Sequence, residues 1–310
     1  MKKVNVILPA YQGEEYIGEQ IESLLRQTYP YVDIYIRDDH SSDRTVEIIR
    51  SYMGKEPEGK RIILIDNNNT NWGYVRNVFD TLRLTEPADF YCFSDQDDVW
   101  HDDKIEKCVK LLESKGNELP ALCFTGFNYC YSDLSFMKKS ISAPDHPELR
   151  QVCFDFIALN FNITINHAFR EALFNHLPTD GRYPDYPDFW MSQAAACYGR
   201  LYYLDEETVE YRRNKKAASY ANHSTISMII WQVRKFLFDN KESQQIARDL
   251  REIKNNFDEI MTPSDRKMME CFVHRSVLHY FQRVFFPRRL RRLFKDEVAL
   301  RLMFFLGKLW

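Results

Sequence analysis

Three carboxylates follow directly on a short apolar run in the first third of the chain. The run Phe90-Tyr91-Cys92-Phe93 leads into Ser94-Asp95-Gln96-Asp97-Asp98-Val99-Trp100. When a buried strand ends in clustered acids, their like charges lie close together, which is unfavourable unless a cation neutralises them. Carboxylate oxygens suit Mg²⁺ or Mn²⁺, which proteins usually hold with one or two carboxylates plus the phosphates of a substrate. The segment therefore predicts a metal site that works on a nucleoside diphosphate.

The elements around this segment alternate between strand and helix patterns over the first 130 residues. Apolar β-type runs predict strands at Val4 to Leu8, Ile34 to Ile36, Arg61 to Ile65, Phe90 to Phe93 and Ala121 to Phe124. Apolar residues at helical spacing predict helices from Glu14 to Gln27, from about Asp43, near Tyr74 and near Asp102. This alternation is typical of an α/β fold with a mostly parallel sheet between helices.

Polar or special residues stand at each junction between a strand and the next helix. They are Ala10-Tyr11-Gln12-Gly13, the segment from Arg37 to Asp43, Asn71-Trp72-Gly73 and the cluster at Asp95. In open α/β sheets, ligands bind at the carboxyl ends of the strands, where all these junctions lie. Part of the second junction has an equally good structural explanation, because Ser42 or Asp43 could cap the following helix.

The pattern changes beyond residue 130. Helices are expected from Asn166 to Leu177 and from Asp188 to Tyr198, and two short strands from Leu201 to Leu204 and from Thr208 to Tyr211. From about Ala217 the pattern is almost entirely helical. We therefore expect a first domain over 1–215, with a nucleotide-binding half over about 1–100 and an acceptor half over about 101–215, followed by a helical region over 216–310.

Composition excludes several classes of protein. The chain has 310 residues, of which 45% are hydrophobic and 28% charged, which is typical of a folded protein. A net charge of -3 gives no general basic field for nucleic acid. The seven cysteines form no Cys-x-x-Cys pair and suggest buried thiols in the cytosol. No apolar run is long enough to span a bilayer, so any membrane contact is expected to be peripheral.

Taken together, four motifs resemble those of the family 2 glycosyltransferases. They are Leu8-Pro9-Ala10-Tyr11-Gln12-Gly13, Ile36-Arg37-Asp38-Asp39-His40-Ser41-Ser42-Asp43, Asn71-Trp72-Gly73 with Arg76-Asn77, and Ser94 to Trp100, in the family's order and spacing. The resemblance covers residues 1 to about 215 and is strongest to bacterial enzymes that build rhamnose-containing polysaccharides or O-antigens. It implies a GT-A fold, a nucleoside-diphosphate-sugar donor, Mg²⁺ or Mn²⁺, and inversion at the anomeric carbon.

The resemblance also implies roles for individual residues. Pro9, Ala10 and Tyr11 would border the base, and Asp39 would accept its imide N–H. Arg76 would lie near the base or diphosphate, Asp95 near the ribose and metal, and Asp97 on the metal. Asp98, Trp100 and Trp190 would shape the acceptor side. Chemistry supports the base assignment, because a carboxylate is an acceptor and uracil or thymine presents an N–H between two carbonyls. A dTDP- or UDP-sugar is therefore the expected donor, with dTDP-L-rhamnose suggested by resemblance alone.

Asp188 is the expected general base of the inverting step. It follows Pro184 and Pro187, opens a helix, and lies in Pro187-Asp188-Phe189-Trp190, which resembles the family's acidic motif, usually His-Asp-Trp-Trp. The alternative is that Asp188 caps the helix, and one residue can serve both purposes. Asp185 is the second candidate for the base.

Two departures from the family pattern concern the contacts of the diphosphate and the neighbour of the general base. Many relatives have Tyr-Arg-x-His-Gly where this chain has Tyr211-Arg212-Arg213-Asn214-Lys215. Asn214 can ligate through its carbonyl oxygen but, unlike His, does not titrate. The positive charge that the His would supply is expected from Arg212, Arg213 or Lys215 instead. The expected diphosphate contacts are therefore Arg212, Arg213 and Asn214. The other departure is Pro187, which replaces a polar His beside the base.

The C-terminal stretch from Arg283 to Trp310 interleaves basic and apolar residues, as an interfacial helix would. This pattern predicts contact with the inner face of the plasma membrane and an acceptor saccharide linked to polyprenyl diphosphate. A helix that packs on its own domain, or a helical dimer surface, explains the same pattern equally well.

Two other functions are compatible with parts of the sequence. Loss of the family's His at Asn214 favours a scaffold in a polysaccharide assembly complex that binds nucleotide sugars with little turnover. A nucleotidyltransferase would share the sheet and metal but needs a basic, glycine-rich phosphate loop after the first strand. The chain has Ala10-Tyr11-Gln12-Gly13-Glu14-Glu15 there, which is acidic.

Overall fold

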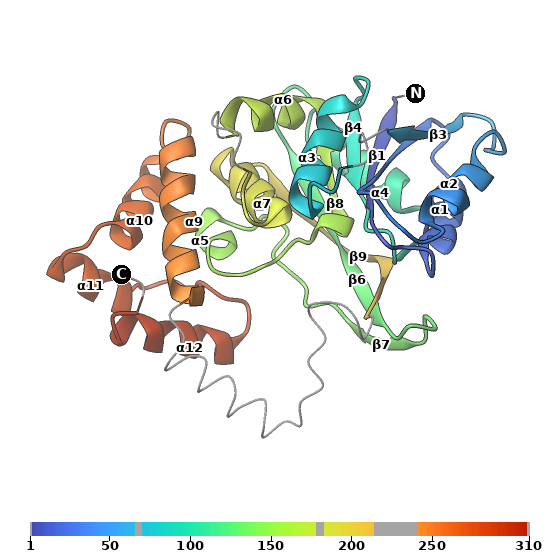
Figure 1. Ribbon diagram of the computed structural model, residues 1–310. Coiled ribbons are helices and arrows are strands. Elements are labelled where there is room, and N and C mark those ends of the chain that lie inside the picture. Colours follow the sequence, from blue (N-terminus) through green and yellow to red (C-terminus); the bar gives the residue numbers. More distant parts are fainter. Residues whose placement is uncertain (1, 66–69, 178–182, 214–240, 309–310) are drawn as a thin grey trace.

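The computed structural model describes residues 2–65, 70–177, 183–213 and 241–308. Its centre is a mixed sheet with the strand order β3-β2-β1-β4-β8-β6-β9-β5, and β7 pairs with β6 at one side of this path. Helices cover both faces of the sheet, and four further helices lie beside it at the C-terminal end of the chain (Figure 1). The α/β architecture predicted from the sequence is confirmed.

The first half of the sheet is parallel. β1 (Val4–Ala10) pairs with β2 (Val32–Asp38) and β4 (Phe90–Phe93), and β2 pairs with β3 (Lys60–Ile65). Every residue of β1, β2 and β4 is buried, as expected for strands with helices on both faces. Because these strands run in one direction, the residues that follow them all lie at the same edge.

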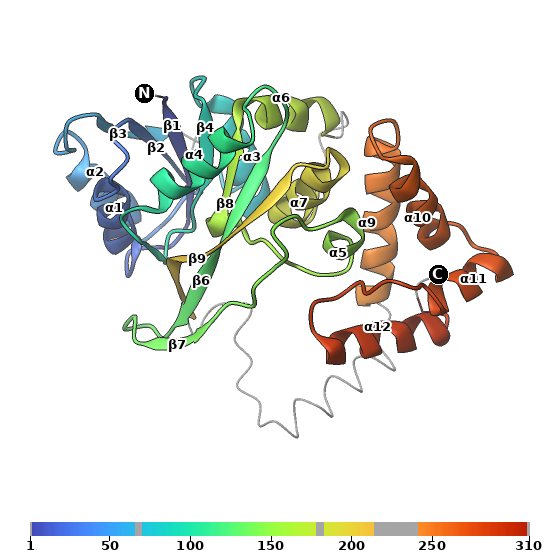
Figure 2. The ribbon, with the colours of Figure 1, turned by 180° about the vertical axis from the view of Figure 1, so that it is seen from behind.

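The second half of the sheet contains antiparallel strands that the sequence pattern did not reveal. β8 (Ile163–Asn166) lies antiparallel between β4 and β6 (Leu122–Cys130). β9 (Leu201–Arg212) is one long strand parallel to β6, where two short strands were expected (Figure 2). The short strands β5 (Val99–Trp100) and β7 (Phe136–Lys139) complete the sheet by pairing antiparallel with β9 and β6.

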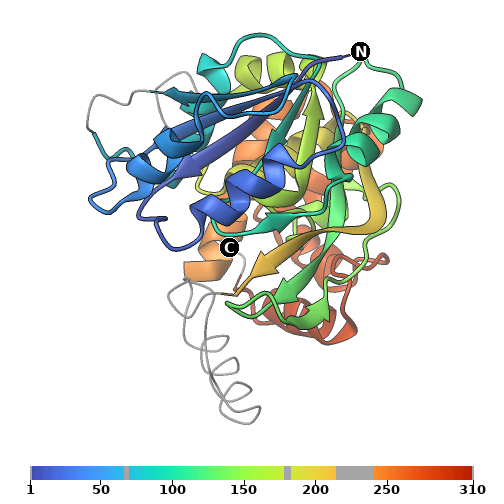
Figure 3. The same cartoon turned by 90° about the vertical axis from the view of Figure 1, so that its right-hand side faces the viewer.

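Alternating side chains of β1 pack into two separate hydrophobic clusters. Val6 and Leu8 belong to a cluster that includes α1 (Ile17–Leu25) and α4 (Lys104–Ser114). Ile7 belongs to another, which includes α3 (Tyr74–Leu84), α6 (His167–His176) and α7 (Pro187–Cys197). α2 (Thr45–Tyr52) packs beside α1, which lies in front of the sheet in Figure 3. α1 is shorter than the expected range from Glu14 to Gln27, whereas α3 begins at Tyr74 as predicted.

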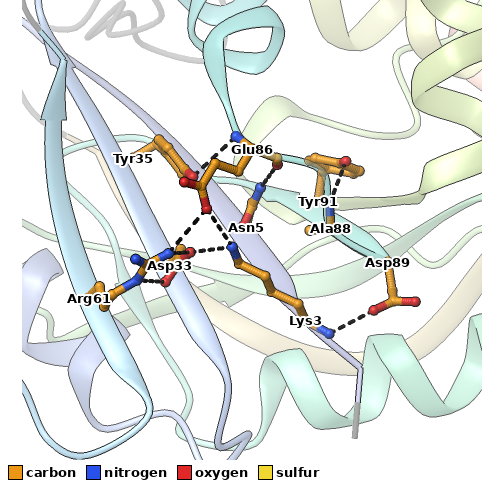
Figure 4. A network of polar contacts seen from close by, with 9 residues as sticks. All are labelled: Lys3, Asn5, Asp33, Tyr35, Arg61, Glu86, Ala88, Asp89 and Tyr91. Carbon is orange, nitrogen blue, oxygen red and sulfur yellow. Dashed lines mark hydrogen bonds and ion pairs between the residues drawn. The ribbon is translucent and has the colours of Figure 1, made fainter.

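A charged network ties the parallel strands together at their amino ends (Figure 4). Asp33 of β2 accepts hydrogen bonds from Arg61 of β3 at 2.7 Å and forms an ion pair with Lys3 at 2.7 Å. Glu86, just before β4, also pairs with Lys3 and Arg61. Burial alone would raise the pKa of Asp33, but the hydrogen bonds from Arg61 and Lys3 lower it. These contacts help to fix the relative positions of the strands from the edge opposite the polar junctions.

The C-terminal helices pack on the same core as the sheet domain. They are α9 (Lys241–Phe257), α10 (Pro263–Val273), α11 (Val277–Val284) and α12 (Phe294–Phe305). α9 lies against α7, and α10 against the short helix α5 (Leu149–Val152) (Figures 1 and 2). Phe257, Phe272 and Phe304 are buried in the cluster that contains Trp190 and Ile7. The predicted boundary at residues 215 and 216 lies outside the described residues.

Two sequence-based expectations about the whole chain can also be compared with the structure. All seven cysteines are buried and free of disulfides, as expected. Within the described ranges, no helix combines the length and the apolar composition that a transmembrane span requires.

Candidate active site

The junctions at the carboxyl ends of β1, β2 and β4 surround a single cavity of about 600 Å³. Its lining includes most of the residues predicted to bind the donor: Pro9, Ala10, Tyr11, Asp39, Asp95, Asp97 and Arg212. Asn71, Gly73, Tyr74, Asn77, Gln96 and Tyr211 complete the lining. The convergence expected from the parallel strands is therefore observed, because elements separated by up to two hundred residues meet at one edge.

Asp39 lies at one side of this cavity and holds the segment that follows β3. Its two carboxylate oxygens accept the backbone N–H groups of Trp72 at 2.7 Å and Gly73 at 2.8 Å. A carboxylate oxygen has a second lone pair, so both oxygens retain acceptor capacity. Asp39 can therefore accept a further N–H from a ligand while it fixes the start of α3.

Gln96 closes the gap between the ends of β1 and β4. Its side-chain carbonyl accepts the backbone N–H of Tyr11, and its amide donates to the carbonyl of Tyr11, both at 2.8 Å. A Cβ at Gly13 would lie 2.4 Å from the same amide oxygen, so the glycine leaves room for this bridge. Gln96, between Asp95 and Asp97, thus fixes the position of Tyr11 in the wall of the cavity.

Asp95 and Asp97 form the acidic side of the cavity. Asp95 accepts a hydrogen bond from the hydroxyl of Tyr74 at 2.9 Å and a longer one from the amide of Asn160 at 3.4 Å. Burial, together with the charge of Asp97, raises the pKa of Asp95 to about 7. Burial also raises the pKa of Asp97. Two neighbouring carboxylates with raised pKa values fit a divalent cation, whose charge would favour their ionised forms.

The described residues contain no group of three or more His, Cys, Asp or Glu side chains that could hold a metal. Among the described residues, the acidic side of the cavity offers the carboxylates of Asp95 and Asp97. Ions such as Mg²⁺ commonly bind one or two carboxylates and complete their coordination with substrate phosphates and water. The donor set is consistent with an ion that binds together with a nucleoside diphosphate.

Arg212, at the end of β9, is the positive group of the cavity. One terminal nitrogen donates to Glu19 at 2.6 Å, and the guanidinium lies 4.2 Å from the centre of the Tyr16 ring. Its Nε and Nη1 atoms are buried and have no hydrogen-bond partner among the described residues. A buried donor without a partner destabilises the folded state, so these two nitrogens are suited to donate to an anionic ligand.

Asp188 lies in the first turn of α7, close to the acidic pair. The helix begins at Pro187 with Tyr186 as its N-cap residue, so the capping role considered for Asp188 is wrong. Burial raises the pKa of Asp188, although the backbone N–H groups of Phe189 and Asn160 lower it. After burial and Asp97, the charge of Asp188 is a further cause of the raised pKa of Asp95. The three carboxylates thus share one electrostatic environment.

With this geometry in place, comparison with known proteins identifies the family. The model of the family described as "Glycosyl transferase family 2" matches residues 5–177, which is more than half of the chain. The chain belongs to glycosyltransferase family 2. The family predicted from the four motifs is therefore confirmed.

The curated proteins similar to this family 2 chain include bacterial glycosyltransferases. RfbG of Shigella flexneri, a dTDP-rhamnosyl transferase, is 33% identical over 107 residues, which are 34% of this chain and 36% of RfbG. AmsB of Erwinia amylovora, an amylovoran biosynthesis glycosyltransferase, is 31% identical over 112 residues, 35% of each chain. The matched segment spans about half or less of the length of the curated relatives.

Solved structures confirm the GT-A fold of this family 2 chain. A fragment of Staphylococcus aureus TarS in complex with UDP-GlcNAc has a TM-score of 0.55 and 15% identity, covering 98% of this chain and 92% of that one. The mannosyltransferase PcManGT from Pyrobaculum calidifontis, in complex with GDP-Man and Mn²⁺, has a TM-score of 0.58 and 14% identity. It covers 96% of this chain and 74% of PcManGT.

Several residues predicted for this site lie elsewhere. Trp100 and Trp190 are only 1% and 4% exposed and pack in the two hydrophobic clusters, so neither ring lines an acceptor surface. Asp98 is fully buried and accepts the backbone N–H of Arg212 at 3.1 Å. Burial, with the charges of Asp97 and Asp95, raises its pKa well above the usual value. Asp98 therefore holds the backbone of Arg212, which lines the cavity.

Arg76 and Arg213 also differ from expectation. The guanidinium of Arg76 stacks 3.5 Å above the ring of Trp72 and pairs with Asp80 at 3.1 Å, outside the cavity lining. Arg213 lies near the ring of Tyr129, 5.7 Å from its centre, and is likewise outside the lining. Asn214 lies outside the described residues.

The structure adds residues that motif analysis missed. Tyr74 directly follows the Asn71-Trp72-Gly73 motif, so its position at the start of α3 was a usable signal. Asn160 had no such signal, because it lies in the one-turn helix η1 (Asn160–Asn162), 65 residues from the aspartate that it contacts. Both side chains bind Asp95 from outside the acidic segment.

Proposed function

We propose that this chain is a metal-dependent inverting glycosyltransferase that moves a sugar from a dTDP- or UDP-sugar to a lipid-linked cell-surface glycan. The observation that carries the proposal is one cavity with Asp39 at one side and the Asp95–Asp97 pair with Arg212 at the other. The printed activity of RfbG supports L-rhamnose as the first candidate for the sugar. The UDP-GlcNAc bound by the TarS fragment supports a pyrimidine nucleotide.

The nucleoside would occupy the side of the cavity formed by Pro9, Ala10, Tyr11 and Asp39. The free acceptor capacity of Asp39 suits the imide N–H of uracil or thymine. Asp95 would face the ribose, and its contact with Tyr74 would hold it in position. A base that presents a carbonyl oxygen instead of this N–H would face the buried carboxylate with a second acceptor, which disfavours its binding.

The diphosphate would lie between Arg212 and Asp97. The two unpaired N–H groups of Arg212 would donate to phosphate oxygens. Asp97, with Asp95, would hold Mg²⁺ or Mn²⁺, which as a Lewis acid stabilises the charge that develops on the leaving diphosphate. Glu19 would keep the arginine in place through its 2.6 Å hydrogen bond.

Asp188 would act as the general base. As the acceptor oxygen forms its bond to C1 of the sugar, the bond from C1 to the diphosphate breaks on the opposite face. The proton of the acceptor hydroxyl passes to the carboxylate of Asp188. Burial raises the pKa of this group and so makes it a stronger base than an exposed aspartate.

The donor assignment can be tested by nucleotide binding. In the presence of Mn²⁺ we expect dTDP and UDP to bind at least about tenfold more tightly than GDP and ADP in calorimetric titrations. Incubation with a panel of dTDP- and UDP-sugars and lipid-linked saccharides should then release nucleoside diphosphate with one donor. Equal affinity for GDP would contradict the assignment of Asp39. Tight binding without turnover on any acceptor would favour the scaffold function.

The C-terminal helices support peripheral binding at the inner face of the plasma membrane. α11 and its C-cap residue expose Val277, Leu278, Phe281 and Phe285. α12 and its C-cap residue expose Phe294, Val298, Leu302, Phe305 and Leu306. The segment between these helices carries the exposed Arg288 and Arg289. Exposed apolar side chains beside a basic segment fit an anionic lipid surface, where the rings enter the interface and arginines meet headgroups.

Liposome sedimentation tests this surface. Phe285 and Phe294 are 74% and 73% exposed, so replacing both with serine should leave the fold intact. We expect the double variant to bind vesicles containing phosphatidylglycerol at least about tenfold more weakly, because each ring contributes roughly 1.5–3 kcal/mol when removed from water. Phe136→Ser, at an exposed ring of β7, is the matched control. Unchanged partitioning of the double variant would rule out this surface.

A further inference from the structure

Two aromatic side chains flank Asp188 and have no role in the donor cavity. Tyr186 is the N-cap residue of α7, two positions before Asp188, and Phe156 lies in the loop that leads into Asn160. Each is 49% exposed. The loop and the helix start are separate in sequence, yet Phe156 stacks on Phe189, the residue that directly follows Asp188.

The two rings are held in a fixed arrangement. Phe156 stacks on Phe189 with ring centroids 4.4 Å apart and an interplanar angle of 28°. Tyr186 meets Phe156 edge to face at 5.7 Å and 83°. Phe189 is buried beneath them. Such contacts between rings are favourable and limit rotation, so the pair presents a defined apolar surface.

The Phe156 loop is anchored by an arginine from the C-terminal region. Arg292 binds Asp155 through its backbone N–H at 3.0 Å and its Nε at 2.9 Å. Its two terminal nitrogens donate to the carbonyls of Phe156 at 2.9 Å and Ile141 at 2.8 Å. A guanidinium that makes several directed hydrogen bonds fixes a loop more firmly than a single charge would.

We propose that Phe156 and Tyr186 form a subsite for a pyranose ring of the acceptor saccharide beside Asp188, and that Arg292 positions this subsite. A pyranose has faces made of C–H groups, which pack on aromatic rings while its hydroxyls remain in water. A preorganised aromatic surface next to the base would bring an acceptor hydroxyl to the carboxylate. This inference rests on the proposed function, because it takes Asp188 as the base.

Saturation-transfer NMR on the full chain tests the subsite with three probes: methyl α-L-rhamnopyranoside, methyl β-D-glucopyranoside and methyl N-acetyl-β-D-glucosaminide. We expect transfer from aromatic protein protons to ring C–H protons of at least one probe. Phe156→Ala and Tyr186→Ala should each weaken this binding by about 3- to 10-fold, as the loss of one aromatic contact predicts. Tyr186→Phe should retain it, and so should Phe136→Ala, which removes an exposed ring of β7.

Arg292→Ala and Asp155→Asn remove the anchor from opposite sides and should give the same loss of saccharide binding. The affinity for dTDP or UDP with Mn²⁺, measured on the same samples, should stay unchanged in all these variants. That difference separates a positioning role from general loss of structure. No transfer in the unaltered protein, or equal transfer in the alanine variants, would overturn the subsite. Failure of nucleotide binding in the unaltered protein would instead overturn the proposed function.

Discussion

Asp188→Asn is expected to lower the rate of sugar transfer by about 10²- to 10⁴-fold, which is the usual contribution of a general base. Asparagine keeps the size of the side chain but cannot accept the proton of the acceptor hydroxyl. The affinity for dTDP or UDP should change little, because Asp188 does not line the donor cavity. Release of nucleoside diphosphate in the presence of a polyprenyl-diphosphate-linked saccharide measures the rate.

Asp185→Asn is the matched control for this prediction. Asp185 was the second candidate for the base and lies only three residues away. Its side chain is 55% exposed and forms a 3.9 Å ion pair with Arg248. We expect this variant to turn over at nearly the rate of the unaltered protein. If Asp185→Asn loses activity and Asp188→Asn keeps it, the two assignments must be exchanged.

Asp97→Asn is expected to abolish metal-dependent nucleotide binding. The change removes a hard anionic ligand, so the affinity for dTDP or UDP in Mn²⁺ should fall by about 10²-fold or more. Adding EDTA should weaken binding to the unaltered protein but have no further effect on the variant. Calorimetric titration with and without the chelator measures both effects. Asp102→Asn, at an exposed acid beyond β5, is the control.

The same variant has an opposite expected effect on stability. After burial, the charge of Asp97 is a cause of the raised pKa values of both Asp95 and Asp98. Removing that charge relieves repulsion, so without metal the free energy of unfolding should increase by about 1 kcal/mol. A lower melting temperature together with lost binding would show that Asp97 has a structural role instead. Higher stability with lost binding is the signature of a residue that serves a ligand.

Local chemistry explains which parts of this site could be predicted from the sequence. The strand that precedes Asp95 and Asp97 can be recognised from its own residues, without reference to distant elements. Parallel strands then bring Ala10, Asp39 and Asp95 to one edge of the sheet. The start of α3 at Tyr74 follows from its glycine-containing junction in the same way. The junctions that line this cavity can therefore be predicted, because each junction is specified by a few consecutive residues.

The second half of the sheet depends on pairings across long sequence distances, and the sequence pattern predicts few of them. β8 inserts antiparallel between β4 and β6, and this insertion brings Asn160 to Asp95. The resemblance to the family implies an acceptor-side role for Trp100. The pairing of β5 with β9 instead turns its ring inward, where Lys104 lies 3.6 Å from the ring centre. No short motif specifies such pairings.

The hydrophobic cluster shared by the sheet domain and the C-terminal helices has a consequence for how such chains diverge. Trp190 of α7 packs against Phe257 of α9 at 5.2 Å, and Phe154 beside α5 packs against Phe272 of α10 at 4.8 Å. Recombination between relatives that exchanged only the last hundred residues would pair ring surfaces that had not been selected together. The two regions are therefore expected to be inherited as a unit, and substitutions at these four aromatic positions should covary.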